Sequence, residues 1–272
     1  MRRVINDLLP HIVLIVFCSI ILVPLLWLLR VALTNKLQAY QIPPEWSIPH
    51  IRNFVEIFTV HPFSDYFLNS VTVAIGSTLV ALPLAALMAY SFARYNTGGL
   101  PLRLVTLSSQ MLPPVILVLP LFNLFLKTSL LNTLPGLIIA HVTISLPFLA
   151  WLLVSFFEGD IILLEQAARI DGAGVLRTFF SVILPNAKPV FASVAILTFL
   201  TQWGAFLWPL MVTSSESVRP LPLAIATFHG LPPLQWGDIF AFGMMMVLPV
   251  LLVFLLFQPW FVRGVAATGM KG

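Results

Sequence analysis

Apolar residues gather in six long runs, and most polar residues lie between them. The hydrocarbon core of a bilayer is about 30 Å thick, and an α-helix crosses it with about 20 residues. Each run reaches that length, so we expect six transmembrane helices, over residues 11–33, 68–92, 104–126, 134–157, 190–212 and 239–262. The pattern predicts an all-α integral membrane protein with a single transmembrane domain over residues 1–272.

The segments between the runs alternate between the two sides of the predicted membrane. One side holds the loops 34–67 and 213–238 and a turn at 127–133, and the other holds 93–103, 158–188 and the tail 263–272. Segment 158–188 is the longest on its side and contains the polar stretch Glu165 to Gly174. It is therefore the main candidate for function outside the membrane.

Two features within the runs are informative. The stretch from Met111 to Val115 contains two adjacent prolines and predicts a helix break, because proline lacks a backbone N–H and clashes with the preceding turn. Polar side chains at membrane depth need partners in protein or in a water-filled cavity. Such groups are His141, Ser145, Thr201 and Gln202. They either line a pathway or tie helices together.

Segment 158–188 carries its own start and stop signals. Asp160 can cap a helix that begins near Ile161, because its carboxylate can accept a backbone N–H of the first turn. Gly172 can end that helix, since glycine adopts the left-handed conformation without a side-chain clash. A second apolar stretch, 175–184, then stops at Pro185. We expect a short helix, a turn and another short helix.

The first of these short helices has small residues on one face. Ala168 and Gly172 are four residues apart and share that face, and Ala167 lies beside them. The nearby charged side chains are Glu165, Arg169 and Asp171. This arrangement predicts a docking surface for a partner. The alternative is an amphipathic helix in the membrane interface, with residues 161–164 in lipid.

Composition agrees with lipid as the main solvent, since the chain is 59% hydrophobic and 9% charged, with a mean hydropathy of +1.00. Lys and Arg accumulate in short cytoplasmic segments. Of the 14, nine lie on the side of 158–188: Arg2, Arg3, Arg94, Arg103, Arg169, Arg177, Lys188, Arg263 and Lys271. This excess predicts that both termini are cytoplasmic. The net charge of +4 reflects topology, and nothing resembles a nucleic-acid-binding surface.

The first run follows Met1-Arg2-Arg3, a basic start like that of a secretory signal. Its apolar stretch is about 20 residues long and no small-residue cleavage site follows, so we expect a retained helix. Cys18, the one cysteine, lies inside this run and offers neither a disulfide framework nor a metal cluster.

Motifs for chemistry are scarce. A Walker A loop needs Gly-Lys-Ser/Thr, and none of the lysines has those neighbours, so any ATP-derived energy must come from a partner. An intramembrane enzyme could use His141 and Ser145, but neither His-Glu-x-x-His nor Gly-x-Ser-x-Gly occurs. A gradient-driven secondary transporter usually has embedded ionisable groups and internal symmetry, and beyond His141 neither is evident.

The polar stretch resembles the EAA loop of ABC importer inner-membrane subunits. That loop reads Glu-Ala-Ala, three residues, Gly, nine residues, a β-branched apolar residue, one more, then Leu-Pro. The residues at these spacings are Ala167, Ala168, Gly172, Val182, Leu184 and Pro185. Gln166 stands at the usual Glu position with Glu165 just before it, so the family's charged contact is either displaced to Glu165 or replaced by a neutral hydrogen bond.

The resemblance covers nearly the whole chain. Residues 112–114, 120–122 and 131–136 are similar to the third and fourth helices of sugar-importer permeases, and 236–238, 248–249 and 264–272 to the maltose-type second permease subunit. In the fifth helix such subunits often carry Trp-Asn-Glu-Phe, whereas this chain has Trp203-Gly-Ala-Phe206.

The resemblance implies an alternating-access importer in a bacterial or archaeal cell (inner) membrane, with a cytoplasmic coupling helix between helices four and five. Two related permease subunits form the pathway, an ABC ATPase dimer binds ATP and Mg below, and an extracytoplasmic solute-binding protein delivers the solute above. Loop 213–238 would face the binding protein and the Lys271 tail the ATPases. This chain would hold no cofactor or metal. The implied coupling residues are Glu165, Gln166, Ala167, Ala168, Asp171, Gly172, Val182, Leu184 and Pro185.

The implied solute is an oligosaccharide, disaccharide, polyol or sugar or glycerol phosphate. Aromatic rings can stack on sugars, but the same rings can belong to the core or to the lipid belt. The candidate pathway-lining residues are His141, Ser145, Thr201, Gln202, Trp203, Phe206 and Trp208. Alternatively, the partner permease holds the main sugar site.

Overall fold

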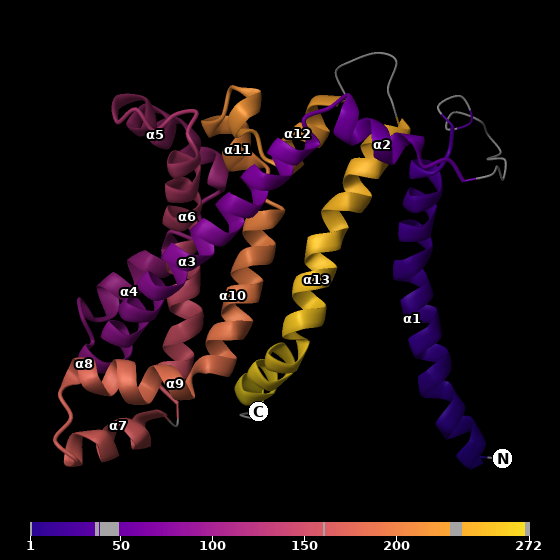
Figure 1. Cartoon of the computed structure of the whole chain (residues 1–272). Coiled ribbons are helices and arrows are strands. Elements are labelled where there is room, and N and C mark those ends of the chain that lie inside the picture. The colour runs from indigo at the N-terminus through magenta and orange to yellow at the C-terminus, as the bar shows by residue number, and fades with distance from the viewer. Residues whose placement is uncertain (1, 36–37, 39–48, 160, 229–235, 270–272) are drawn as a thin grey trace. The chain divides into compact units, whose positions relative to one another are not determined.

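The computed structural model describes residues 2–35, 38, 49–159, 161–228 and 236–269. They form two compact units: unit 1 is Met1–Ser64 with Ala224–Pro249, and unit 2 is Asp65–Leu223 with Val250–Gly272. The described residues are helical or irregular, with no strand (Figure 1). The helices are α1 (Arg2–Ala32), α2 (Arg52–Thr59), α3 (Phe63–Tyr95), α4 (Gly99–Ser108), α5 (Pro114–Lys127), α6 (Leu134–Phe157), α7 (Ile161–Ile170), α8 (Val175–Arg177), η2 (Thr178–Ile183), α9 (Leu184–Asn186), α10 (Lys188–Trp203), α11 (Leu207–Val212), η3 (Glu216–Val218), α12 (Leu221–Thr227) and α13 (Trp236–Gly269).

Four of the described helices are long and apolar enough to cross a membrane: Leu9–Ala32, Phe63–Tyr95, Leu134–Phe157 and Trp236–Pro259. A fifth span results if Val175–Asn186 and Lys188–Trp203, which meet at a bend of 76°, count as one. The prediction of an all-helical membrane protein agrees with this architecture. Among the described residues, helix length and apolar composition therefore identify four or five spans, and the predicted six are not reached.

Two predicted helices are broken. Residues 104–126 form α4 and α5, because Pro114 forces Pro113 into an extended conformation with ψ 125°. The helix break predicted between Met111 and Val115 is confirmed, so residues 104–126 form two helices. Residues 190–212 divide likewise: α10 ends at Trp203, Gly204 follows it, and α11 begins at Leu207.

In unit 1, the second helix closes the end of the first. Asn53 of α2 is buried, and its side-chain amide donates to the carbonyl oxygens of Ala32 at 2.8 Å and Thr34 at 2.9 Å. These bonds satisfy carbonyls that a helix end leaves without intrahelical partners. Gly237 lies so close that an added Cβ would be 2.4 Å from the Asn53 amide nitrogen. The glycine of the Trp-Gly-Asp stretch is therefore required by packing.

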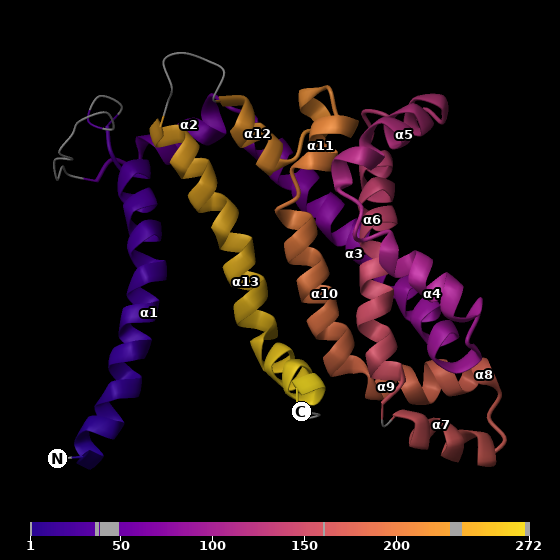
Figure 2. The same ribbon diagram turned by 180° about the vertical axis from the view of Figure 1, so that it is seen from behind.

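In unit 2, α3 and α6 form the main core. Ala81, Ala85 and Ala89 of α3 recur every four residues and are buried together with Leu153 and Phe157 of α6. Small side chains allow close helix contact, which matters in lipid because apolar burial alone does not drive helices together. Both ribbon views place α7 and α8 at one end of this unit, and α5 and α11 at the other (Figure 1; Figure 2).

Candidate functional site

A short helix and a tight turn form the polar stretch. Helix α7 begins at Ile161, as predicted, while its predicted cap, Asp160, lies outside the described residues. The helix ends in a Schellman motif, in which Ala173 N–H donates to the Ala168 carbonyl at 2.9 Å and Gly172 N–H to the Arg169 carbonyl at 3.0 Å. Gly172 has φ +77°, so the predicted role of this glycine as the helix stop is confirmed.

The chain after the turn is helical from Val175 to Asn186, with a π-helical turn, η2, at its centre. It runs two residues beyond the predicted 175–184, and Pro185 lies in the last turn, just before the bend. Thr178, Phe179 and Ile183 are buried, whereas Val182 and Leu184 are partly exposed and Pro185 is exposed. A π-helical turn often occurs where a helix carries a functional constraint.

Helix α7 turns one face into its own chain. Ile161, Glu165 and Ala168 form the buried stripe, and Ala168 is 7% exposed. The expectation that Ala168 and Gly172 share a surface open to a partner is therefore wrong: Ala168 packs inward, while Gly172 has no neighbour within 4 Å of an added Cβ. The exposed face instead contains Leu163, Gln166, Ala167, Ile170 and Asp171, of which Ile170 is 86% exposed.

The buried acidic side chain of α7 is held by three donors. Glu165 is 3% exposed. Its Oε1 accepts from the Tyr90 hydroxyl at 3.1 Å and from Arg169 Nη2 at 2.6 Å, and its Oε2 accepts from Arg94 Nε. We call these four residues the Glu165 cluster. The negative charge of Glu165 raises the pKa of the Arg169 guanidinium above its usual value.

The Glu165 cluster joins α7 to the last turns of α3, across 71 and 75 residues of sequence. A second ion pair joins α4 to the end of α6, seven residues before Glu165: Arg103 Nη1 lies 3.1 Å from Glu158 Oε1. Sequence reasoning missed Tyr90 and Arg94. The available signal was a basic residue in the last turn of a long apolar helix, together with a single carboxylate on the buried face of an amphipathic helix.

The candidate pathway residues do not share one environment. His141 is 2% exposed, and neither ring nitrogen has a hydrogen-bond partner among the described residues. Gln202, Trp203 and Trp208 are also buried; Trp203 packs edge-on against Phe67, with ring centroids 5.7 Å apart. Ser145 is partly exposed and donates to the His141 carbonyl at 2.8 Å. Thr201 and Phe206 are the two exposed members of the set.

Residues 213–221 are fixed by three polar side chains. Asn132 Oδ1 accepts from the backbone N–H of Ser214 and Ser215 at 3.0 and 2.9 Å, and from the Ser215 hydroxyl at 3.0 Å. Asn69 donates to the carbonyls of Ser217 and Arg219, and Ser70 accepts from Leu221 N–H. Part of loop 213–238 is thus held in place, although 229–235 lie outside the described residues.

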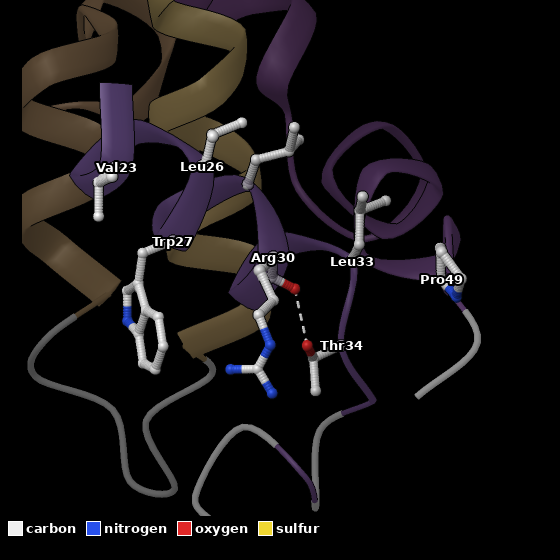
Figure 3. Close-up of a pocket in the computed structure, with 8 residues that line it drawn as sticks. Val23, Leu26, Trp27, Arg30, Leu33, Thr34 and Pro49 are labelled. Carbon is white, nitrogen blue, oxygen red and sulfur yellow. Dashed lines mark hydrogen bonds between the residues drawn. The ribbon is translucent and has the colours of Figure 1, made fainter. Parts of the chain in front are cut away.

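A pocket of about 470 Å³ lies at the end of α1 in unit 1 (Figure 3). Its lining is mostly apolar, and the Arg30 guanidinium lies 5.1 Å from the centroid of the Trp27 ring. Trp and Arg at a helix end are typical of the membrane interface. The described residues contain no group of three or more His, Cys, Asp or Glu side chains suited to a metal ion.

Comparison with known proteins gives a consistent result. The model of the family described as "Binding-protein-dependent transport system inner membrane component" matches residues 81–267, more than half of the chain. The chain is 35% identical over 269 residues to the diacetylchitobiose uptake system permease protein NgcG of Streptomyces coelicolor, covering 96% of this chain and 87% of that protein.

Two further comparisons extend over nearly the whole chain. The trehalose/maltose transport system permease protein MalG of Thermococcus litoralis is 30% identical, with 95% of this chain and 94% of that protein covered. A chain in the crystal structure of a bacterial ABC transporter involved in the import of the acidic polysaccharide alginate shares the fold, with a TM-score of 0.74 at 18% identity, covering 94% of this chain and 96% of that chain.

Proposed function

The chain belongs to the family of binding-protein-dependent transport system inner membrane components, and we propose that it forms half of the translocation pathway of an ATP-driven sugar importer. It is a multi-pass membrane protein of the permease type. Membership of a binding-protein-dependent family leaves the gradient-driven alternative without support.

The proposed partners follow from the family. A second, related permease completes the pathway, an ABC ATPase dimer supplies the energy and a solute-binding protein delivers the substrate. ATP and Mg belong to the ATPase in this proposal, since the chain lacks a Walker A loop. Both termini and segment 158–188 are proposed to be cytoplasmic, on the basis of the excess of Lys and Arg on that side. We propose six spans: the four long helices, the bent pair Val175–Asn186 and Lys188–Trp203 counted as one span, and a span that includes α5.

The exposed face of α7 carries the proposal that the ATPase docks at this helix. Ile170 is 86% exposed beside the Gly172 turn, and Leu163 is also exposed. Large apolar side chains on a short helix at one end of the unit suit a groove in a partner. We include Gln166, Ala167, Asp171 and Gly172 in the docking surface, with Val182, Leu184 and Pro185 supporting it from the following helix.

The proposed substrate is a disaccharide or short oligosaccharide, because the matched relatives are named for diacetylchitobiose and for trehalose and maltose. Polyols and sugar or glycerol phosphates remain within the proposed class. Phe206 and Thr201 are the pathway candidates with exposed side chains, so they are the first residues to test for sugar contact. The buried candidates, His141, Gln202, Trp203 and Trp208, are proposed to act through helix packing around the pathway.

Copurification tests the docking proposal. The chain is expressed with the permease and ATPase encoded beside it, and bound ATPase is quantified for the wild type and for Ile170→Asp. We expect stoichiometric ATPase with the wild type and a loss of about tenfold or more with Ile170→Asp, because a carboxylate would replace the exposed apolar side chain that the proposed complex would bury.

Val60→Asp is the matched control. Val60 is exposed at the end of α2, and the same charge there should leave ATPase binding unchanged. Absence of ATPase from the wild-type complex would contradict the proposed function. Binding that is the same for Ile170→Asp and the wild type would instead favour α7 as a helix of the membrane interface.

A further inference from the structure

The only acidic residue on the buried stripe of α7, Glu165, is directed into the protein's own core. The side chain of Glu165 is 5% exposed, and that of Arg94, on α3, is 10% exposed. The docking face of α7 consists of other residues, among them Gln166 and Ile170. An ATPase seated on that face could not reach the Glu165 carboxylate without displacing α7 from its own chain.

The ionic arrangement depends on Glu165. One carboxylate accepts from two guanidinium groups and one phenol, so both of its oxygens are used. Arg94 Nη2 is buried and has no hydrogen-bond partner among the described residues, so Glu165 supplies the hydrogen bond and counter-charge that the structure gives this guanidinium. Loss of Glu165 would leave a buried cation unpaired, which is far more costly than loss of a surface ion pair.

The two arginines occupy different positions. Arg169 lies one turn after Glu165 on α7 itself, and its side chain is 52% exposed, so this ion pair joins two residues of the same helix. Arg94 and Tyr90 belong to α3. The bonds from Arg94 and Tyr90 therefore connect the short helix to a long apolar helix of the core.

We propose that the Glu165 cluster is the joint through which movement of α7 is passed to α3, with Glu165, Arg94 and Tyr90 as positioning residues for coupling. The inference rests on the proposed function, since it takes α7 as the ATPase-docking helix. A charge-assisted joint suits this role because such bonds are short and directional. Without it α7 would still present its docking face, but its displacement would be absorbed by the turns at either end.

The test separates docking from coupling. The complete complex, with both permeases, the ATPase and the binding protein, is reconstituted in lipid vesicles, and uptake of a labelled disaccharide is divided by ATP hydrolysed. We expect Glu165→Gln and Arg94→Gln to lower this ratio by about tenfold or more, while the amount of copurified ATPase stays within about twofold of the wild type.

Exchange of the two charges tests whether coupling depends on the ion pair between residues 94 and 165 or is lost through general destabilisation of this region. The double variant Arg94→Glu with Glu165→Arg keeps one carboxylate and two guanidinium groups in the cluster, because Arg169 is unchanged. We expect this double variant to recover at least half of the decrease in sugar uptake per ATP hydrolysed. If the single variants fail to accumulate in the membrane, recovery of both accumulation and coupled uptake in the double variant supports the joint, and no recovery overturns it.

Arg52→Gln is the matched control. Arg52 Nε also pairs with a carboxylate, Glu56 Oε1, at 2.7 Å, but its side chain is 80% exposed. An exposed ion pair contributes little, so we expect Arg52→Gln to keep the wild-type sugar uptake per ATP hydrolysed. A wild-type ratio in Glu165→Gln or Arg94→Gln would overturn the inference. Loss of bound ATPase from these variants would also overturn the inference, because Glu165 would then be needed for assembly, but it would not contradict the proposed function. Absence of ATPase from the wild-type complex would contradict the proposed function itself.

Discussion

Individual residues of the turn after α7 are explained by backbone geometry. Gly172 has φ +77°, a region that costs an L-residue about 1–2 kcal/mol, yet an added Cβ there would meet no atom within 4 Å. Gly174 has equally open surroundings, but its φ of −71° is ordinary. The two glycines are therefore constrained differently although they lie two residues apart.

Substitution by valine should separate the two positions. We expect Gly172→Val to destabilise the turn by about 1–2 kcal/mol and to increase protease cleavage between α7 and α8, while Gly174→Val changes little. Gly172→Asn should be close to the wild type, because asparagine tolerates the left-handed region. Limited proteolysis of the purified protein measures the effect, and equal cleavage of the two valine variants would refute the backbone argument.

A different glycine is required by contact. A Cβ on Gly136, in the first turn of α6, would lie 2.0 Å from the Leu130 carbonyl oxygen. We expect Gly136→Ala to lower the free energy of unfolding by about 2 kcal/mol or more, seen as a reduced thermal midpoint in detergent. Gly243→Ala is the control, since nothing lies within 4 Å of that position, and it should be neutral or slightly stabilising. Equal midpoints for the two variants would show that the contact is not decisive.

Whole elements follow the sequence where local signals agree. Helix α6 has the predicted bounds because Thr133 caps it, accepting from Gly136 N–H at 3.0 Å, and proline occupies its first turn. The Pro-Pro break and the Gly172 stop are likewise local. The continuous helix over 190–212 failed because apolar composition does not reveal where a short helix ends. The inward turn of Ala168 and the Glu165 cluster depend on contacts between distant segments, which periodicity cannot identify.

The segment held by Asn132 offers a prediction about an element. Asn132 has φ +57° and accepts three hydrogen bonds from Ser214 and Ser215. Asn132→Gly should keep the backbone conformation but lose those bonds, at a net cost of about 1–3 kcal/mol, and Asn132→Ala should lose more through added strain. We expect faster proteolysis of residues 213–219 in both variants and the lower thermal midpoint in Asn132→Ala. Unchanged proteolysis would show that these bonds do not hold the segment.

At the scale of the whole molecule, the proposed importer role requires one orientation in the membrane. Gly174 and Ser214 are both exposed and are proposed to lie on opposite sides. In a Cys18→Ser background, Gly174→Cys should react with a membrane-impermeant thiol reagent only after the cells are opened, whereas Ser214→Cys should react in cells whose outer barrier alone is permeable. Labelling of both cysteines from the same side would contradict the proposed topology.

The most direct test of the central claim is transport by the reconstituted complex. This chain, its partner permease and the ATPase are placed in vesicles with the binding protein outside and ATP within, and uptake of labelled disaccharides is followed. We predict uptake that requires both ATP and the binding protein and that persists when proton and sodium gradients are collapsed. Uptake that continues without ATP and stops when a gradient is collapsed would contradict the account of this chain as a binding-protein-dependent importer subunit.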